Sequence, residues 1–176
     1  VWLNADKLPY PRYYEEMRGT FTANRAIDWL RQHKDDAEPF ALWVSFPEPH
    51  SPYDFPIDLK DQYDPKTFDV PKVGPEDAGQ IPLIFRDLTP ADKQGIAAAY
   101  YTAVSALDRN VGDVLKTLDQ LGLAENTCVF YMADHGYCLG QHGRFEKHCG
   151  YEPALRVPLL VRYPGRIRKG AVVNDF

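Results

Sequence analysis

The sequence lacks several features that would assign it to whole classes of protein. No apolar run approaches the roughly 18 residues that a membrane span needs, and no basic and apolar leader precedes residue 20. Cationic residues are not in excess, because 20 Lys and Arg stand against 25 Asp and Glu for a net charge of −5. This balance argues against a nucleic-acid partner, which is bound mainly by neutralising phosphates. We therefore expect a soluble chain with no membrane span, and its compartment is left open.

Cysteine is scarce, and no Asn-x-Ser/Thr acceptor site for glycosylation occurs. Three cysteines cannot all pair within one chain, so free thiols explain them better than a disulfide framework does. Of the 176 residues, 44% are apolar and 26% are charged, which is typical of a folded domain. The sequence starts at Val1 and stops at Phe176 without a terminating pattern. We expect residues 1–176 to form a single partial domain.

Hydrophobic periodicity predicts an α/β fold. Residues 20–34 have the apolar spacing of a helix of about four turns. A second helix is predicted from Thr89, an N-cap residue followed by Pro90, to the capping Gly122. Three apolar runs of strand length are predicted as strands: 40–46, 128–133 and 157–162. Because strands alternate with helices, we expect a mainly parallel sheet flanked by helices.

Polar residues follow two of these predicted strands. Asp134 and His135 come directly after the second strand, and His50 lies in a proline-rich turn after the first. Ligands collect at the carboxyl ends of strands in open α/β sheets, and a carboxylate beside an imidazole suits a divalent cation. Simpler interpretations stay open: a strand-ending turn for Asp134 and His135, a hydrogen-bonded loop histidine for His50, and a solvated surface lysine for Lys147.

A cluster of histidine and cysteine residues offers a different metal site. The four residues with ligand types suited to zinc are Cys138, His142, His148 and Cys149. Their spacing is not a known zinc-finger pattern, and two adjacent ligands would need an awkward turn to face one ion. A non-catalytic module stabilised by zinc is therefore one alternative function for the chain.

Several motifs between Tyr100 and Gly165 resemble, in order and spacing, the sulfatase family of the alkaline phosphatase superfamily. The motifs that carry this resemblance are Asp134-His135-Gly136-x2-Leu139-Gly140-x-His142-Gly143, Lys147, Tyr151-Glu152-x3-Arg156-Val157-Pro158-Leu159 and Arg162-x-Pro164-Gly165. Upstream, residues 40–56 are similar to the family's strand followed by a Pro-x-Pro-His-x-Pro turn. The resemblance covers about residues 20–170. It implies an alkaline phosphatase-like α/β/α sandwich that is incomplete at both ends.

The resemblance also implies a function, a sulfuric ester hydrolase that cleaves a small anionic sulfate ester with the help of a metal. Asp134 and His135 would bind one divalent cation, for which calcium is the first choice and magnesium and manganese are alternatives. Lys147 would contact the sulfate oxygens, and His50 would lie near the bridging oxygen as a ligand or proton donor. His142 would line the pocket or orient its loop from behind. A phosphodiesterase or phosphonate monoester hydrolase of the same superfamily is the alternative enzyme.

Two parts of the family's active site are missing from the sequence. The family's nucleophile is a formylglycine made from Cys or Ser in a Cys/Ser-x-Pro-x-Arg motif, and no such motif occurs here. The acidic pair that supplies the remaining metal ligands is missing as well. We therefore expect the formylglycine to lie outside this segment. The organic part of the substrate and the oligomeric state are left open.

We predict that the 176-residue chain alone hydrolyses no sulfate ester, because it carries two metal ligands and no nucleophile motif. The measurement is turnover of an aryl sulfate by the isolated chain in the presence of calcium, magnesium or manganese. Turnover above the buffer background would contradict the prediction.

Overall fold

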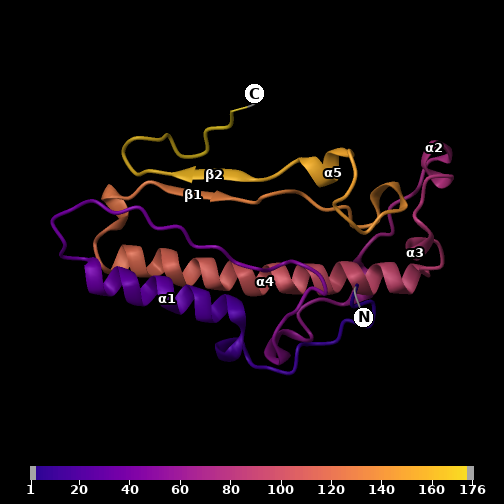
Figure 1. Cartoon of the computed structure of the whole chain (residues 1–176), viewed down its shortest axis with the longest axis horizontal. Helices are drawn as coiled ribbons and strands as arrows, with labels where there is room; N and C mark the ends of the chain where they lie inside the picture. The colour runs from indigo at the N-terminus through magenta and orange to yellow at the C-terminus, as the bar shows by residue number, and fades with distance from the viewer. Residues whose placement is uncertain (1–2, 174–176) are drawn as a thin grey trace.

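Two long helices form one layer of the molecule and a pair of strands forms another (Figure 1). The computed structural model describes residues 3–173. Helix α1 (Arg18–His33) and helix α4 (Pro90–Gln120) lie side by side, and strands β1 (Val129–Met132) and β2 (Leu159–Arg162) pair with each other. Both helices and two of the three predicted strands are therefore confirmed, with slightly different bounds.

Shorter elements lie in the connections between these four. The single-turn 3₁₀ helices are Tyr14–Glu16, Ile57–Leu59, Pro65–Thr67, Ala124–Asn126 and Gln141–Gly143. The short α-helices are α2 (Pro75–Ala78), α3 (Leu83–Arg86) and α5 (Glu152–Leu155). The proline-rich stretch from residue 47 to residue 88 thus contains isolated helical turns within a long loop.

Helix α4 begins and ends at the residues that its sequence predicts. Thr89 Oγ1 accepts a hydrogen bond from the Asp92 backbone N–H at 3.1 Å, and Asp92 Oδ2 accepts one from the Thr89 N–H at 2.8 Å. This reciprocal capping box satisfies two backbone groups that the first turn of a helix leaves unpaired. Beyond the last turn, Gly122 has φ of +70°, a left-handed conformation that glycine adopts without strain.

Helix α1 packs against the second half of α4 with both helices running in the same direction. At one end, the buried Tyr14 donates its hydroxyl to Asn110 Oδ1 at 2.7 Å, and the Arg109 guanidinium lies 3.7 Å from the centre of its ring. At the other end, Leu30 of α1 and Leu118 of α4 share a small buried cluster. Burial raises the pKa of Tyr14 to about 12, so its phenol stays protonated and can donate.

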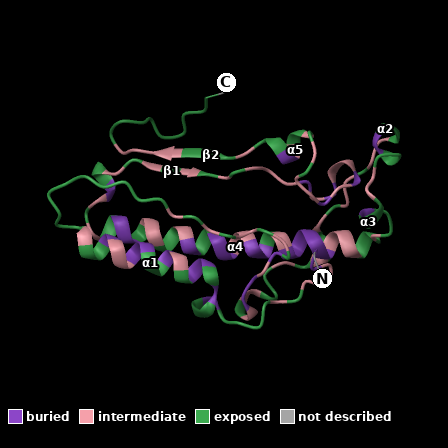
Figure 2. Cartoon of the chain, in the orientation of Figure 1, coloured by how far each residue is buried: buried purple, intermediate pink, exposed green. Residues whose placement is uncertain are grey.

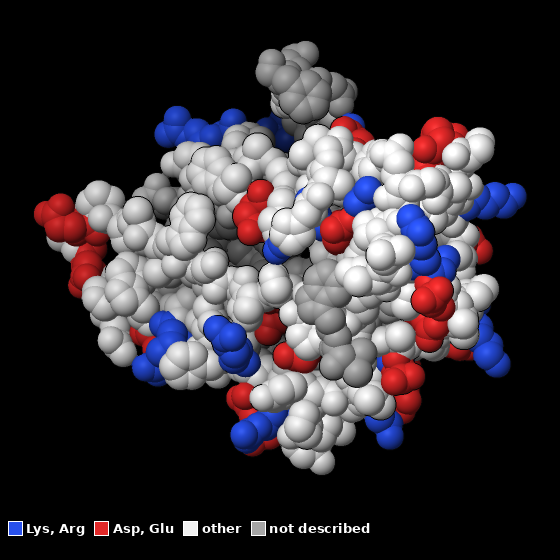
Figure 3. Space-filling view, turned by 45° about the vertical axis from the view of Figure 1, so that its right-hand side comes forward, with Lys and Arg blue, Asp and Glu red and all other residues white. Residues whose placement is uncertain are grey.

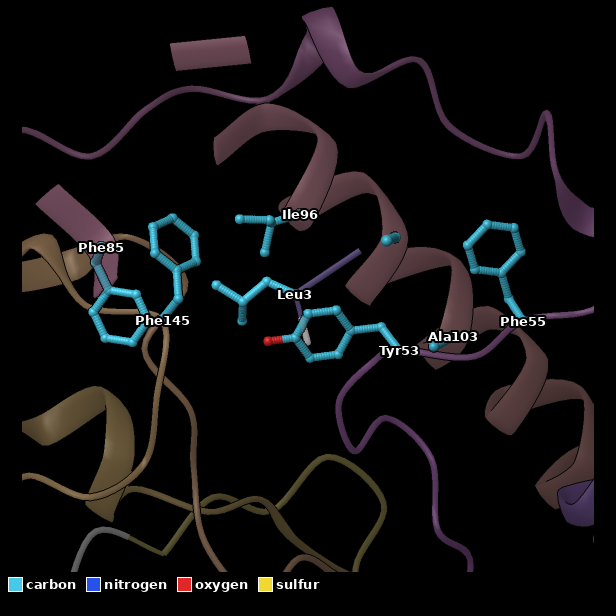
Figure 4. Close-up of a cluster of buried hydrophobic side chains, with 8 residues drawn as sticks. Leu3, Tyr53, Phe55, Phe85, Ile96, Ala103 and Phe145 are labelled. Carbon is cyan, nitrogen blue, oxygen red and sulfur yellow. The ribbon is translucent and has the colours of Figure 1, made fainter. Parts of the chain in front are cut away.

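A second buried cluster covers the first half of α4 (Figure 4). Ile96 from α4 packs with Phe85 from α3, with Tyr53 and Phe55 from the proline-rich loop, and with Phe145 from the segment between the strands. Figure 2 shows that buried residues gather along the helices and these loops, whereas the strand pair is more exposed. This cluster therefore anchors two loops, the proline-rich loop that follows residues 40–46 and the segment that follows β1.

The sheet differs from the prediction of a mainly parallel one. Residues 3–173 contain a single two-stranded antiparallel sheet, in which Val129 pairs with Arg162 and Met132 with Leu159. A parallel pair needs a crossover connection that carries the chain back to the same end. The segment between β1 and β2 contains only single helical turns, so the chain folds straight back and the strands run in opposite directions.

The predicted strand at 40–46 is wrong. This stretch is not part of any sheet within the described residues, and Trp43 in its middle is 84% exposed. A strand requires a neighbour that completes its backbone hydrogen bonds, and an apolar run by itself does not supply one. The segment instead runs along the cavity described below.

No helix within residues 3–173 is long and apolar enough to cross a membrane. The expectation of a partial domain rests in part on the termini at Val1 and Phe176. Both termini lie outside the described residues.

Replacement of Leu30 by Ala should lower the free energy of unfolding by about 2–5 kcal/mol, because a side chain that is 1% exposed leaves a cavity between α1 and α4. The matched control is Leu83→Ala, whose side chain is 74% exposed and whose loss should cost less than about 0.5 kcal/mol. Urea unfolding of the protein that contains this chain measures both. Equal losses in the two variants would contradict the packing described here.

Candidate active site

Asp134 and His135 lie just beyond β1, where the turn that carries them is held against the segment before β2. The Gly136 N–H donates to the Ala154 carbonyl at 2.8 Å. A Cβ at position 136 would lie 2.2 Å from the Pro153 carbonyl oxygen, so only glycine allows this close approach. The glycine of the Asp-His-Gly motif therefore fixes the turn from which the carboxylate and the imidazole project.

The donor atoms of this pair are open to a cation. His135 Nδ1 lies 2.7 Å from the Gly136 carbonyl oxygen, which can only accept, so Nδ1 carries the proton and Nε2 presents a lone pair. Asp134 is 87% exposed, and its Oδ2 lies 3.6 Å from His135 Nε2. Two ligands at right angles on one cation, each about 2.0–2.6 Å from it, are about 2.8–3.7 Å apart. The two side chains thus fit adjacent positions on one divalent ion.

The described residues supply two such ligands and no larger set. Within residues 3–173, no group of three or more His, Cys, Asp or Glu side chains is arranged to hold a metal ion. Any further ligands of the ion would have to come from outside residues 3–173.

Lys147 is positioned by a loop that is closed by backbone hydrogen bonds. The Cys138 N–H donates to the Glu146 carbonyl at 2.9 Å, and the Gly140 N–H donates to the Arg144 carbonyl at 2.8 Å. Arg144 forms an ion pair with Glu146 and also donates to the Gln80 carbonyl at 2.9 Å. The loop returns the chain from position 138 to position 147, so that Lys147 lies beside the segment after β1.

Two tyrosines, the buried Tyr53 and the partly buried Tyr137, connect this loop to the turn that contains His50. Tyr53 donates its hydroxyl to the Tyr137 hydroxyl at 2.7 Å, and Tyr137 donates to the Phe145 carbonyl at 2.7 Å. Burial raises the pKa of both phenols, that of Tyr137 to about 12, so both keep the protons that the chain of hydrogen bonds needs. The tyrosines bridge 84 residues of sequence and hold the two predicted strand exits together.

Four of the five residues to which the resemblance gives a role in the site line one open cavity of about 2620 Å³ between α4 and β1: His50, Asp134, His135 and Lys147. Glu48 and Asp54 line it as well, and burial raises the pKa of both carboxyl groups. Sequence reasoning missed these two, although both lie within four residues of His50. Acidic and basic side chains are interspersed over the face in Figure 3, and neither sign forms a continuous patch there.

His142 lies outside this cavity, in a partly buried contact with helix α2. Its Nδ1 donates to Asp77 Oδ2 at 2.7 Å, and its ring stacks on that of Tyr151 with centroids 3.7 Å apart. Tyr151 donates to the other oxygen of Asp77 at 2.7 Å. These contacts attach the proline-rich loop to the segment that carries Lys147. Sequence reasoning missed Asp77, which lies 65 residues before its partner.

The four residues of the zinc alternative do not come together as a metal site. Cys138 and Cys149 are neighbours, with their Sγ atoms 3.8 Å apart, but His142 is engaged by Asp77. His148 is exposed and lines the cavity. Because the part of the chain that the structure describes contains no cluster of three metal-ligating side chains, it gives no support to a structural zinc.

A carboxylate–imidazole pair, a second imidazole and a lysine around one cavity are side chains that can bind a divalent cation and an anion. Comparison with known proteins gives the particular family. The family model named Sulfatase matches residues 2–175, and the chain belongs to the sulfatase family.

The relatives of the chain are longer than it is. It is 34% identical to an iduronate 2-sulfatase of Mus musculus, with 82% of this chain and 30% of that protein covered. It is 32% identical to an arylsulfatase of Clostridium perfringens (strain 13 / Type A), with 90% and 34% covered. The chain therefore spans about a third of the length of these relatives.

The fold is similar to that of a phosphonate monoester hydrolase, SpPMH from Silicibacter pomeroyi, whose structure has been solved. The TM-score is 0.78 at 22% sequence identity, with 92% of this chain and 38% of that one covered. At this identity the likeness concerns the fold alone. It supports the alkaline phosphatase-like architecture that the motifs imply, although the two described strands are antiparallel.

Asp77 should stabilise the protein at neutral pH and lose that effect in acid. Hydrogen bonds from His142 and Tyr151 lower its pKa below the ordinary 3.8. Its contribution is therefore fully present above pH 3.8 and is lost as the pH falls through the lowered pKa. We expect Asp77→Asn to have a lower melting temperature than the wild type at pH 7, and the difference to shrink below pH 4.

Thermal unfolding from pH 7 down to pH 3 tests this, with Asp87→Asn as the control because Asp87 is exposed. A pH-independent difference between Asp77→Asn and the wild type would refute a role for the carboxylate charge.

Proposed function

We propose that the protein hydrolyses sulfuric esters and that residues 1–176 are one partial sulfatase domain with part of the active site. One observation carries the proposal. In a chain of the sulfatase family, Asp134, His135, Lys147 and His50 line the same cavity, although they come from segments almost 100 residues apart. The hydrogen-bond chain from Tyr53 through Tyr137 to Phe145 provides a physical reason why they do.

Asp134 and His135 are the residues that would hold the divalent cation of the family. Their 3.6 Å separation is compatible with adjacent ligand positions, and the family resemblance makes calcium the first choice of ion. When bound, the cation would stabilise negative charge on the oxygens of the reacting ester. The formylglycine and the remaining ligands would come from outside this segment, since no Cys/Ser-x-Pro-x-Arg motif occurs in it.

Lys147 provides the positive charge that an ester sulfate needs. Its ammonium forms no ion pair within residues 3–173, so it is free to bind an anion, and its side chain is half-buried on the cavity wall. Sulfuryl transfer spreads negative charge over the equatorial oxygens of sulfur. A fixed ammonium beside those oxygens stabilises the transition state more than the ground state.

His50 is suited to the leaving-group side of the reaction. Its Nδ1 lies 2.8 Å from the Ser51 carbonyl oxygen, which can only accept, so Nδ1 is the donor there and Nε2 is not used in this hydrogen bond. In the protonated ring, Nε2–H would donate a proton to the oxygen that leaves with the organic half of the substrate. Ester cleavage would then release a neutral alcohol or phenol instead of a free alkoxide.

Hydrolysis of a phosphodiester or a phosphonate monoester is the competing function, because the resemblance extends to these branches of the superfamily and their tetrahedral anions suit the same charges. The decisive experiment uses the protein that contains this chain, loaded with calcium. Its kcat/KM is measured on an aryl sulfate, an aryl phosphodiester and an aryl phosphonate. We expect the sulfate to be the best substrate. A higher kcat/KM for the phosphodiester or the phosphonate would overturn the assignment.

Replacement of Lys147 by Ala should lower kcat/KM for an aryl sulfate by about 100-fold or more, because it removes a charge that acts mainly in the transition state. Lys60→Ala is the matched control, since Lys60 is exposed and does not line the cavity. It should stay within about twofold of the wild type. A loss of similar size in both variants would show that Lys147 has no special role.

A further inference from the structure

Two of the three cysteines are neighbours in the loop that carries Lys147. The Sγ atoms of Cys138 and Cys149 lie 3.8 Å apart, and both are free thiols. Cys138 is fully buried and Cys149 is partly exposed. Neither has a part in the proposed ester hydrolysis. The third cysteine, Cys128, is exposed just before β1 and serves as an internal reference.

The backbone holds the two thiols in this position. The Cys138 N–H donates to the Glu146 carbonyl at 2.9 Å, which closes the loop on one side. The Cys149 N–H donates to the Lys147 carbonyl at 2.9 Å, so the backbone of Cys149 is tied directly to that of Lys147. The sulfur–sulfur contact is thus built by the same loop that positions the lysine.

We propose that Cys138 and Cys149 form a reversible disulfide when the protein meets a hydroperoxide, and that this bond displaces Lys147. The Cys149 thiolate attacks a peroxide oxygen and breaks the O–O bond, which gives a sulfenic acid and hydroxide. Cys138 then attacks the sulfur of the sulfenic acid, the S–O bond breaks, and water leaves. In sum, two thiols and one hydrogen peroxide give one disulfide and two waters. A dithiol reverses the change.

The order of these steps follows from exposure. Cys149 is the thiol that a small oxidant can reach, whereas Cys138 has no exposed surface. Burial, followed by the neighbouring Cys149, raises the pKa of Cys138 to about 12, so Cys138 is a poor nucleophile toward a solution oxidant. Its place beside Cys149 makes it the resolving thiol once the sulfenic acid has formed.

Formation of the bond would move the loop. The two sulfur atoms must approach from 3.8 Å to about 2.05 Å, and Cys149 is the more exposed of the two cysteines. A shift of Cys149 is passed to Lys147 through their shared backbone hydrogen bond. Because a misplacement of about 1 Å at a reacting centre can cost about 100-fold in rate, the oxidised protein should turn over substrate more slowly.

The first test is the covalent bond itself, which does not depend on the proposed function. The protein that contains this chain is treated with hydrogen peroxide, alkylated and digested with trypsin. Tryptic peptides 117–144 and 148–156 should be recovered as one species that is 2 Da lighter than the sum of the two. A further cleavage before Asp134 separates Cys128 from Cys138 and shows which cysteine is linked.

Cys128→Ser should leave the linked species unchanged, whereas Cys149→Ser and Cys138→Ala should abolish it. Wild-type protein that shows only sulfinic acid at Cys149, or a bond through Cys128, would overturn the proposal.

The second test measures the effect on Lys147 and rests on the proposed function. The kcat for an aryl sulfate should fall at least about 10-fold on oxidation and recover with dithiothreitol, and Cys149→Ser should not respond to mild peroxide. A fully oxidised protein with unchanged kcat would overturn the link between the disulfide and Lys147. If the protein shows no sulfatase activity at all, the peptide analysis still decides whether the disulfide forms.

Discussion

The hydrogen bond between the hydroxyls of Tyr53 and Tyr137 is the constraint on which the candidate active site depends. It joins the turn after His50 to the segment after Asp134 and His135, and Tyr137 extends it to the loop that ends at Lys147. Tyr53 is fully buried and Tyr137 is partly buried, and burial raises the pKa of both phenols, so an unpaired hydroxyl here would cost the desolvation of a polar group. Breaking this hydrogen bond would therefore cost free energy. The bond keeps the turn after His50 and the segment after His135 in fixed positions relative to each other.

Helix α4 supplies the surface on which this arrangement rests. One side of the helix is rich in small residues, and it is covered by α1 and the loops of the core. The other side carries half-buried residues such as Tyr100, Val104 and Val111, and it forms a wall of the open cavity. The capping box at Thr89 and the glycine at position 122 define the length of this support. The helix thus forms one side of the cavity, and the turn after β1 lines it as well.

The loops carry the chemistry, and contacts distant in sequence position them. His142 illustrates this. From the sequence it could line the pocket or orient its loop, and the structure places it against Asp77 and Tyr151, away from the cavity. The link from α2 to the segment with Lys147 joins residues 65 positions apart. Local sequence patterns contain no signal for such a pair, because its energy depends on burial that only the folded chain creates.

The sequence by itself determined the features that depend on neighbouring residues. Helices α1 and α4, the cap at Thr89 and strands β1 and β2 follow from periodicity and local hydrogen bonding, and the order of motifs around Asp134 and Lys147 identified the family. Tertiary structure alone decided the rest. The apolar run at 40–46 is not a strand because no described strand pairs with it, and β1 and β2 are antiparallel because no crossover helix separates them. The tyrosine bridge joins residues 84 positions apart, and strand pairing and the contact of Cys138 with Cys149 depend on how the segment after β1 folds back on itself.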